Sequence, residues 1–358
     1  MTPDRVPAPA PAPAGNASAG NASAGKATTG KATTAKGAQS VKTGSTGKSG
    51  RPGGKPPGVA AVRRATARDW IAGARVQTLP LAIAPVALGT AAAYLLPHEA
   101  DGPGWHWLRA ALCLVVAVAL QVGVNFANDY SDGIRGTDRY RVGPRRLTAS
   151  GAARPRTVFI VALVFFGVAA IAGLIIVVRT QEWWLLAVGA AAIVAAYFYT
   201  GGRRPYGYYG FGEVFVFVFF GLVATVGTTY VLASTVNVES WLGGVAIGLL
   251  ACAALMVNNI RDIAQDQRAS KRTLAVVMGD RPARVLYAVL MLVPFGILGF
   301  FVLFYSNAYL VFFALLAAVP AALITLTAKT APELILALRL TALTALVYGV
   351  GLGVAIAF

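Results

Sequence analysis

Residues 107–138 read WLRAALCLVVAVALQVGVNFANDYSDGIRGTD, a long apolar run that ends in a cluster of amide and acidic side chains. An apolar run of about 20 residues is the length that an α-helix needs to cross the hydrocarbon core of a bilayer. Acidic side chains are rare at membrane depth, and they mark functional sites when they occur there. The stretch therefore predicts a membrane-spanning helix with a polar site at its C-terminal end.

Apolar runs of this kind recur from Thr78 to the C-terminus. The whole chain is 57% hydrophobic and 13% charged, whereas about a quarter of the residues of a soluble domain are charged. We therefore expect an all-α polytopic membrane protein, a bundle of about nine transmembrane helices. The nine predicted spans cover residues 77–96, 107–128, 156–178, 183–200, 214–235, 241–260, 282–304, 307–328 and 335–357.

The N-terminal residues differ in composition from the rest of the chain. Residues 1–62 alternate Pro and Ala and then repeat the units GNASA and GKATT. Such a segment cannot bury enough apolar surface to offset its ordering entropy. We predict a disordered, low-complexity basic tail at residues 1–62 and a membrane domain at residues 63–358, which begins with a short interfacial helix. Contact of the tail with anionic lipid is the alternative to a solvated tail without a specific role.

The formal net charge of +17 does not indicate a nucleic-acid-binding protein. The basic residues lie in the tail and in a few loops, whereas a nucleic-acid-binding face would interleave them with aromatic residues on a soluble module. The loops after the second, fourth and sixth predicted spans are rich in Arg and Lys, and the intervening loops are nearly free of them. The positive-inside rule then places the N-terminus and these three loops in the cytoplasm.

A second acidic cluster follows the sixth predicted span, where residues 258–266 read NNIRDIAQD. In both clusters an amide and two carboxylates are spaced so that a helix would carry them on one face. These residues are Asn125, Asp129 and Asp132 in the first cluster, and Asn258, Asp262 and Asp266 in the second. The equivalent positions of the two clusters, after spans two and six, suggest a weak internal repeat.

Carboxylates on one helix face repel one another, and burying them at membrane depth costs several kcal/mol unless a cation compensates. Oxygen ligands without His or Cys favour Mg²⁺, which commonly bridges carboxylates and substrate phosphates. Solvated acids at helix ends are the alternative, and the presence of two equivalent clusters weakens it. The predicted metal ligands are Asn125, Asn128, Asp129, Asp132, Asn258, Asp262 and Asp266.

Basic residues follow each acidic cluster directly. A diphosphate would add negative charge to a site already rich in carboxylates, so arginine and lysine are needed to balance it. The same residues also serve the positive-inside rule, which is the alternative explanation for their presence. The candidates for diphosphate binding are Arg141, Arg145, Arg146, Lys271 and Arg272.

A third polar segment, residues 199–213, reads YTGGRRPYGYYGFGE. Its glycines and proline predict a structured turn. Its aromatic side chains are suited to line a hydrophobic cleft or to stabilise a developing cation, although an interfacial aromatic belt would have a similar composition. The predicted substrate-pocket residues are Asp138, Tyr199, Thr200, Arg204 and Tyr206.

The two acidic motifs resemble those of the UbiA superfamily of intramembrane aromatic prenyltransferases. That superfamily carries N-D-x-x-D and D-x-x-x-D on helices two and six of a nine-helix bundle, matched here by residues 128–132 and 262–266. Longer motifs at residues 75–80, 125–138, 204–213 and 258–274 are similar to its menaquinone branch, the 1,4-dihydroxy-2-naphthoate polyprenyltransferases. The resemblance covers about residues 66–358. Gly136 and Ser270 depart from it, because relatives often carry Asp and Gly at these positions.

The resemblance implies a Mg²⁺-dependent enzyme of the bacterial plasma (inner) membrane. The expected reaction moves a polyprenyl chain from its diphosphate to 1,4-dihydroxy-2-naphthoate, with loss of CO₂ and diphosphate, to give demethylmenaquinone. The carboxylates of Asp129, Asp132, Asp262 and Asp266 would be catalytic and would hold the metal, so alanine at Asp129 or Asp262 should abolish transfer without unfolding the protein. The water-insoluble isoprenoid tail would leave through a lateral opening into membrane lipid.

Two alternatives to this function remain open. A prenyltransferase could use another acceptor, such as 4-hydroxybenzoate, homogentisate or a sugar phosphate. A channel or transporter that binds Mg²⁺ in transit would also need paired carboxylates. Transport sites usually lie near mid-membrane, whereas these acids lie at the ends of predicted spans beside basic loops, which favours a diphosphate site.

Overall fold

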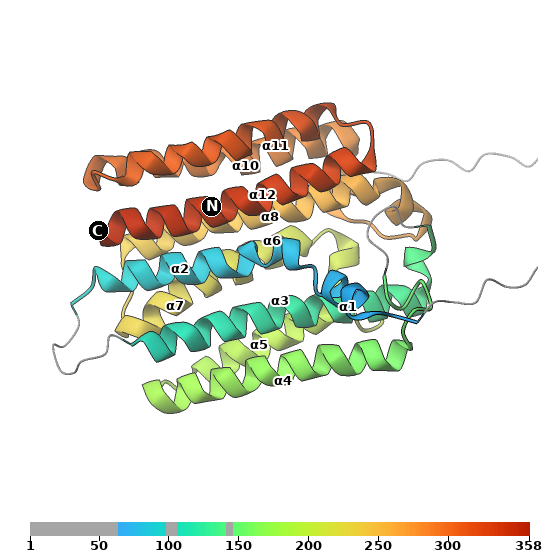
Figure 1. Cartoon of the computed structure of the whole chain (residues 1–358), viewed down its shortest axis with the longest axis horizontal. Helices are drawn as coiled ribbons and strands as arrows, with labels where there is room; N and C mark the ends of the chain where they lie inside the picture. The colour runs from blue at the N-terminus through green and yellow to red at the C-terminus, as the bar shows by residue number, and fades with distance from the viewer. Residues whose placement is uncertain (1–63, 98–105, 141–145) are drawn as a thin grey trace, which may run out of the picture. The chain divides into compact units, whose positions relative to one another are not determined.

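The computed structural model describes residues 64–97, 106–140 and 146–358, and every regular element in these ranges is helical (Figure 1). The predicted tail, residues 1–62, lies outside the described residues. The α-helices are α1 (Ala67–Ala74), α2 (Pro80–Tyr94), α3 (Trp107–Arg135), α4 (Pro155–Thr180), α5 (Leu185–Phe198), α6 (Gly212–Val216), α7 (Ala224–Ala233), α8 (Val238–Arg268), α9 (Leu274–Met278), α10 (Asp280–Phe304), α11 (Leu315–Thr327) and α12 (Ala331–Ala357). The 3₁₀ helices are η1 (Val76–Thr78), η2 (Thr137–Tyr140), η3 (Tyr206–Tyr209) and η5 (Ala308–Ala314), and η4 (Phe217–Val223) is a π-helix.

Each of the nine predicted spans contains a helix, which confirms the predicted fold class of a polytopic helical membrane protein. Seven helical segments in the described ranges are long and apolar enough to cross a membrane. An eighth forms if the segment Ala67–Thr78 is joined to α2 across a bend of 47°. The ninth, α5, has only 14 residues, so it is shorter than the predicted span at residues 183–200.

Helix α8 lies at the centre of the bundle and packs against α2, α10, α12 and η4. Within its most apolar 18 residues 72% are buried, a larger share than in any other described span. Glycines permit the close approach of η4: a Cβ at Gly221 would lie 2.6 Å from the carbonyl oxygen of Gly244, and one at Gly248 would lie 2.7 Å from the ring of Phe217. Small residues at helix contacts let backbones meet in this way in membrane proteins.

The end of α3 explains one departure from the family pattern. Gly136 caps α3 with φ 72°, in the left-handed region. Glycine adopts this conformation without the steric cost that a side chain would add. Gly136 therefore ends the helix directly after the first acidic cluster, and η2 places Asp138 beside that cluster.

Candidate active site

Asp129 is the most deeply buried carboxylate of the first cluster, with 1% of its surface exposed. Its Oδ2 accepts a hydrogen bond from the backbone N–H of Leu147 at 2.8 Å, and its Oδ1 accepts one from the N–H of Thr148 at 2.9 Å. Each carboxylate oxygen has two lone pairs, so each keeps one acceptor position. Asp129 thus fixes the start of the segment that leads into α4.

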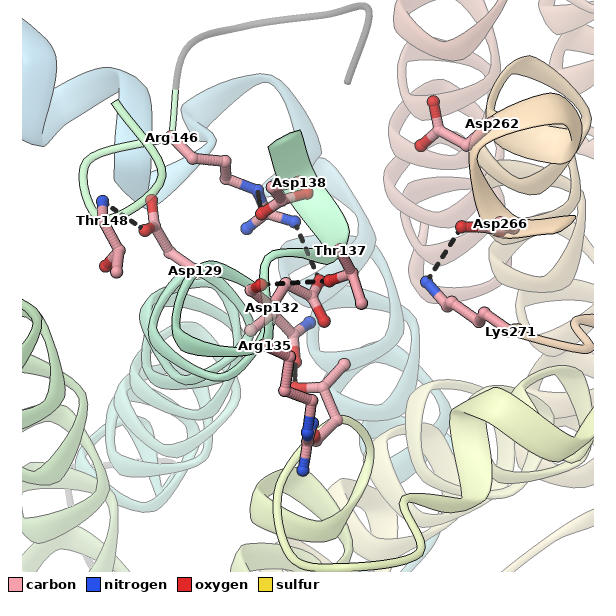
Figure 2. Close-up of polar contacts among 12 residues, drawn as sticks. Asp129, Asp132, Arg135, Thr137, Asp138, Arg146, Thr148, Asp262, Asp266 and Lys271 are labelled. Carbon is pink, nitrogen blue, oxygen red and sulfur yellow. Dashed lines mark hydrogen bonds and ion pairs between the residues drawn. The ribbon is translucent and has the colours of Figure 1, made fainter. Parts of the chain in front are cut away.

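Arg146 joins Asp132 of the first cluster to Asp138, which lies beside that cluster. Its Nη2 lies 3.6 Å from Oδ2 of Asp132, and its Nε lies 3.3 Å from Oδ2 of Asp138. Figure 2 shows the arginine side chain between these two carboxylates, with Asp129 beside it. Because all these side chains are buried, the ion pairs are needed to offset the cost of desolvation. The first cluster is therefore charge-compensated by a predicted diphosphate-binding residue.

The second cluster, at the end of α8, has its own basic partners. Asp262 accepts hydrogen bonds from Nε and Nη2 of Arg261 at 2.8 and 2.7 Å. Oδ1 of Asp266 lies 3.5 Å from Nζ of Lys271, and its Oδ2 accepts a 3.4 Å hydrogen bond from the hydroxyl of Thr273. The contact between Asp266 and Lys271 faces the first cluster in Figure 2.

Tyr208, in η3, connects the two clusters. Its hydroxyl donates a 2.7 Å hydrogen bond to Oδ1 of Asp132, and its ring centroid lies 5.2 Å from Nζ of Lys271. The guanidinium of Arg135 lies 5.5 Å from the same centroid, and the backbone carbonyl of Tyr208 accepts from the N–H of Arg272 at 2.9 Å. Burial, and then the charge of Asp132, raise the pKa of Tyr208. The phenol thus remains a neutral donor that links residues 132 and 271.

The sequence did not single out Tyr208, although the third polar segment contains it. Aromatic residues in that segment have similar surroundings in the sequence, and only the fold shows which one reaches Asp132. Glu213 was also missed: its Oε1 accepts a 2.9 Å hydrogen bond from Asn259. An acidic residue among glycines was the only signal for it.

The predicted amide ligands have structural partners. Asn125 donates to the carbonyl of Ala74 at 3.0 Å, and Asn258 donates to the carbonyl of Ala254 at 3.1 Å. Oδ1 of Asn128 accepts a 2.6 Å hydrogen bond from the hydroxyl of Thr200. Thr200 was predicted to line the pocket, and it instead anchors the turn after α5 to α3.

A cavity of about 530 Å³ adjoins the two clusters. Its walls are mostly apolar and come from α2, α3, α4, α5, α8 and the continuous segment α6–η4–α7. Polar side chains are a minority of its lining, and they include an amide from each acidic cluster. The polar lining residues are Arg75, Thr78, Gln121, Asn125, Asn128, Tyr199, Tyr206, Thr228 and Asn258. The cavity is suited to a long apolar molecule with a polar end held near the clusters.

The remaining predicted site residues divide into three groups. Tyr199 and Tyr206 line the cavity, and the ring of Tyr206 stacks on Phe215 with centroids 4.0 Å apart. Arg204 and Arg272 are exposed and do not line it. Arg141 and Arg145 lie outside the described residues. Within the described ranges no three Asp, Glu, His or Cys side chains form a group that could hold a metal ion, so the ligand roles stay a prediction.

Comparison with known proteins gives consistent results. Residues 82–334 match the model of the UbiA prenyltransferase family. The chain is 48% identical over 297 residues to the 1,4-dihydroxy-2-naphthoate octaprenyltransferase of Mycobacterium tuberculosis (strain ATCC 25618 / H37Rv), covering 81% of this chain and 97% of that protein. It is 36% identical over 242 residues to the enzyme of the same name from Escherichia coli (strain K12), covering 66% of this chain and 76% of that protein.

Two solved structures share the fold. A UbiA homologue from Aeropyrum pernix K1 is 14% identical, with a TM-score of 0.59, and covers 76% of this chain and 96% of its own. A UbiA homologue from Archaeoglobus fulgidus bound to GPP and Mg²⁺ is 16% identical, with a TM-score of 0.52, and the match covers 81% of this chain and 99% of that homologue.

Proposed function

Because the chain belongs to the UbiA prenyltransferase family, we propose that it transfers a polyprenyl chain from polyprenyl diphosphate to 1,4-dihydroxy-2-naphthoate. The products are CO₂, diphosphate and the reduced form of demethylmenaquinone, the quinol, because both ring hydroxyls of the naphthoate remain and no oxidant takes part. The observation that carries this proposal is the apolar cavity whose lining includes Asn125 of the first acidic cluster and Asn258 of the second. The names of its relatives in two bacteria support the naphthoate as acceptor over 4-hydroxybenzoate or homogentisate.

The site residues have the chemistry that Mg²⁺ requires. Their donor atoms are carboxylate and amide oxygens, and Mg²⁺ is usually bound by one or two carboxylates together with substrate phosphates and water. The ion would be held by Asp129, Asp132, Asp262 and Asp266, with the amides of Asn125, Asn128 and Asn258 nearby. When bound, it supplies the positive charge that makes diphosphate a good leaving group.

The basic residues next to the acids are placed to bind the diphosphate. Arg146 and Lys271 each contact a carboxylate, Asp132 and Asp266 respectively. In the donor complex these two cations would turn to the diphosphate oxygens, for which arginine forms charge-assisted pairs and lysine acts as a point charge. They would thereby hold the allylic end of the donor at the polar end of the cavity.

The reaction then needs a dry site that tolerates positive charge on carbon. The allylic C–O bond breaks with its electron pair going to the diphosphate, and the naphthoate ring carbon that bears the carboxylate forms the new C–C bond. Loss of CO₂ returns an electron pair to the ring. The faces of Tyr199 and Tyr206, which line the cavity, can stabilise the cationic carbon, and the apolar walls exclude the water that would otherwise trap it.

We place the site on the cytoplasmic side of a bacterial plasma membrane. Arg146, Arg261 and Lys271 contact carboxylates of the two acidic clusters, and the positive-inside rule assigns loops rich in such residues to the cytoplasm. Charged donors made in the cytoplasm could then reach Arg146 and Lys271 directly, and membrane lipid would surround the apolar faces of the helices.

The proposal can be tested with purified protein, octaprenyl diphosphate and naphthoate labelled with ¹³C in its carboxyl group. Mass spectrometry should detect labelled CO₂ and prenylated product in equal amounts, the product being demethylmenaquinol together with any quinone that air oxidation forms from it. Product formed from 4-hydroxybenzoate or homogentisate, with none from the naphthoate, would contradict the assigned acceptor. Absence of prenylated product from every acceptor would contradict the prenyltransferase function itself.

A further inference from the structure

Arg75 is the only charged residue among the described residues that line the cavity. Every other polar side chain in that lining is an amide, a hydroxyl or a thiol. Arg75 itself is half-buried. An ionised side chain in apolar surroundings costs free energy unless an ion of opposite charge lies near it. The cavity wall therefore has one place at which an anion would be stabilised by a fixed positive charge.

The backbone of Arg75 has a conformation that favours glycine. Arg75 caps the C-terminus of α1 with φ 54° and ψ 54°, in the left-handed region. Glycine is the usual residue at such a helix end, because a side chain adds steric strain there. Strained backbone of this kind is concentrated at functional sites. The chain keeps an arginine where glycine would be more stable, which indicates a function for the arginine side chain.

Two amide side chains of α3 hold the backbone on either side of Arg75. Asn125 donates to the carbonyl of Ala74 at 3.0 Å. Gln121 donates to the hydroxyl of Thr78 at 3.0 Å, and that hydroxyl donates to the carbonyl of Arg75 at 2.8 Å. Both amides are buried, with 4% of Asn125 and 7% of Gln121 exposed, and both line the cavity. These contacts fix the place from which the arginine side chain starts.

That place is close to the polar end of the cavity. Asn125, which contacts the residue before Arg75, precedes Asp129 by four residues on α3, a rise of about 6 Å. An anion bound to Arg75 would therefore lie near the first acidic cluster, where the allylic carbon of the donor is proposed to react. The aromatic acceptor of the proposed reaction is such an anion, because a carboxyl group is ionised at neutral pH.

We propose that Arg75 binds the carboxylate of the aromatic acceptor. The inference rests on the proposed prenyl transfer and adds the residue that recognises the acceptor. A guanidinium can form two parallel hydrogen bonds to a carboxylate, which would fix the orientation of the ring as well as its place. Once the new C–C bond has formed, the carboxyl group leaves as CO₂ and the electron pair of the broken bond goes to the ring. CO₂ is uncharged, so no ion pair to Arg75 holds it back.

The test compares a carboxylate with an uncharged compound of nearly the same shape. The probes are 1-hydroxy-2-naphthoate and 1-hydroxy-2-naphthamide, and their dissociation constants are measured with the purified full chain without donor. We expect Arg75→Gly to weaken binding of the naphthoate at least tenfold, or ~1.4 kcal/mol, and to change binding of the naphthamide less than twofold. Its melting temperature should not fall, because glycine suits the left-handed backbone.

Ser234→Gly is the matched control. Ser234 caps α7 with φ 55°, also in the left-handed region, and it does not line the cavity. This control should bind both probes as the unsubstituted protein does. Should Arg75→Gly not fold, Arg75→Gln gives the same comparison, since it removes the charge and keeps a hydrogen-bond donor.

Equal losses for both probes, no loss for either, or no binding of either probe to the unsubstituted protein would overturn the assignment. A higher KM for octaprenyl diphosphate with unchanged binding of the naphthoate would also overturn it, because Arg75 would then serve the diphosphate. If the unsubstituted protein forms no prenylated product but binds the naphthoate through Arg75, the proposed function fails while the carboxylate site stands. The two failures are therefore distinguishable.

Discussion

The hydroxyl of Tyr208 donates a 2.7 Å hydrogen bond to Oδ1 of Asp132. The same ring lies beside Lys271, which in turn contacts Asp266. A single side chain thus connects the acidic clusters near the C-terminal ends of α3 and α8, although these are far apart in the sequence.

Removing the Tyr208 hydroxyl should reduce the rate more than the stability. Tyr208→Phe keeps the ring beside Lys271 and deletes only the bond that orients Asp132, so we expect kcat to fall about tenfold, which corresponds to ~1.4 kcal/mol. The Mg²⁺ concentration needed for half-maximal activity should rise in parallel. Tyr209→Phe is the control, because Tyr209 is 55% exposed and should behave like the unsubstituted protein. Unchanged Mg²⁺ dependence in Tyr208→Phe would show that the hydroxyl does not position Asp132.

The structure changes our expectation that alanine at position 129 leaves the fold intact. Asp129→Ala would strand the buried N–H groups of Leu147 and Thr148, and each unpaired buried donor costs about 1–3 kcal/mol. We expect Asp129→Ala to have a clearly lower melting temperature than the unsubstituted protein in metal-free detergent solution. Asp129→Asn should melt between these two, because its amide oxygen still accepts a hydrogen bond. Asp280→Ala, which removes a surface pair with Arg284, should change the melting temperature little. Equal melting temperatures for all three would contradict the role of Asp129 in holding the backbone.

The variant Asp262→Asn distinguishes the effect of Asp262 on kcat from its effect on the melting temperature. Asp262→Ala would leave the buried guanidinium of Arg261 without its carboxylate partner, which is destabilising. Asp262→Asn still accepts a hydrogen bond from Arg261 but removes the negative charge that a metal ion needs. We expect kcat below a tenth of the original value with a smaller loss of melting temperature than in Asp262→Ala. Retention of most activity in the folded Asn variant would exclude Asp262 as a metal ligand.

Lys271 and Arg272 were both predicted to bind the diphosphate, and the structure distinguishes them. Lys271 points to Asp266, whereas the side chain of Arg272 is exposed. Lys271→Met should raise KM for the donor at least tenfold, and Arg272→Met should raise it less than threefold. Steady-state kinetics with varied donor and saturating naphthoate measure both values. The reverse order would mean that the segment rearranges when the donor binds.

Chelation should stop the reaction without unfolding the protein. The carboxylates of Asp132 and Asp266 already have cationic partners in Arg146 and Lys271, so the empty site is not left with uncompensated charge. EDTA should abolish transfer, added Mg²⁺ should restore it, and the circular dichroism spectrum should be the same throughout. Full activity in the chelator would contradict the metal requirement.

The sequence predicted the bundle and the clusters well because both follow from local patterns. Long apolar runs define the helices, and the spacing of Asn125, Asp129 and Asp132 puts them on one helical face. Partners across the fold could not be predicted in this way. The spacing gives no indication that Asp129 holds Leu147, that Tyr208 and not Tyr206 reaches Asp132, or that α5 is too short for a full span.

The hydrogen bonds from the N–H groups of Leu147 and Thr148 to Asp129 also affect the affinity of the proposed metal site. Each oxygen of Asp129 keeps one lone pair beside its backbone hydrogen bond, so the ion would bind a carboxylate that the backbone already orients. The apparent affinity for the ion is then set by the fraction of molecules in which Asp129 is oriented, and a tenfold fall in that fraction weakens metal binding by ~1.4 kcal/mol. The affinity should therefore be adjustable from outside the ligand set, since a change in residues 147–148 that releases the carboxylate would weaken the binding of the ion.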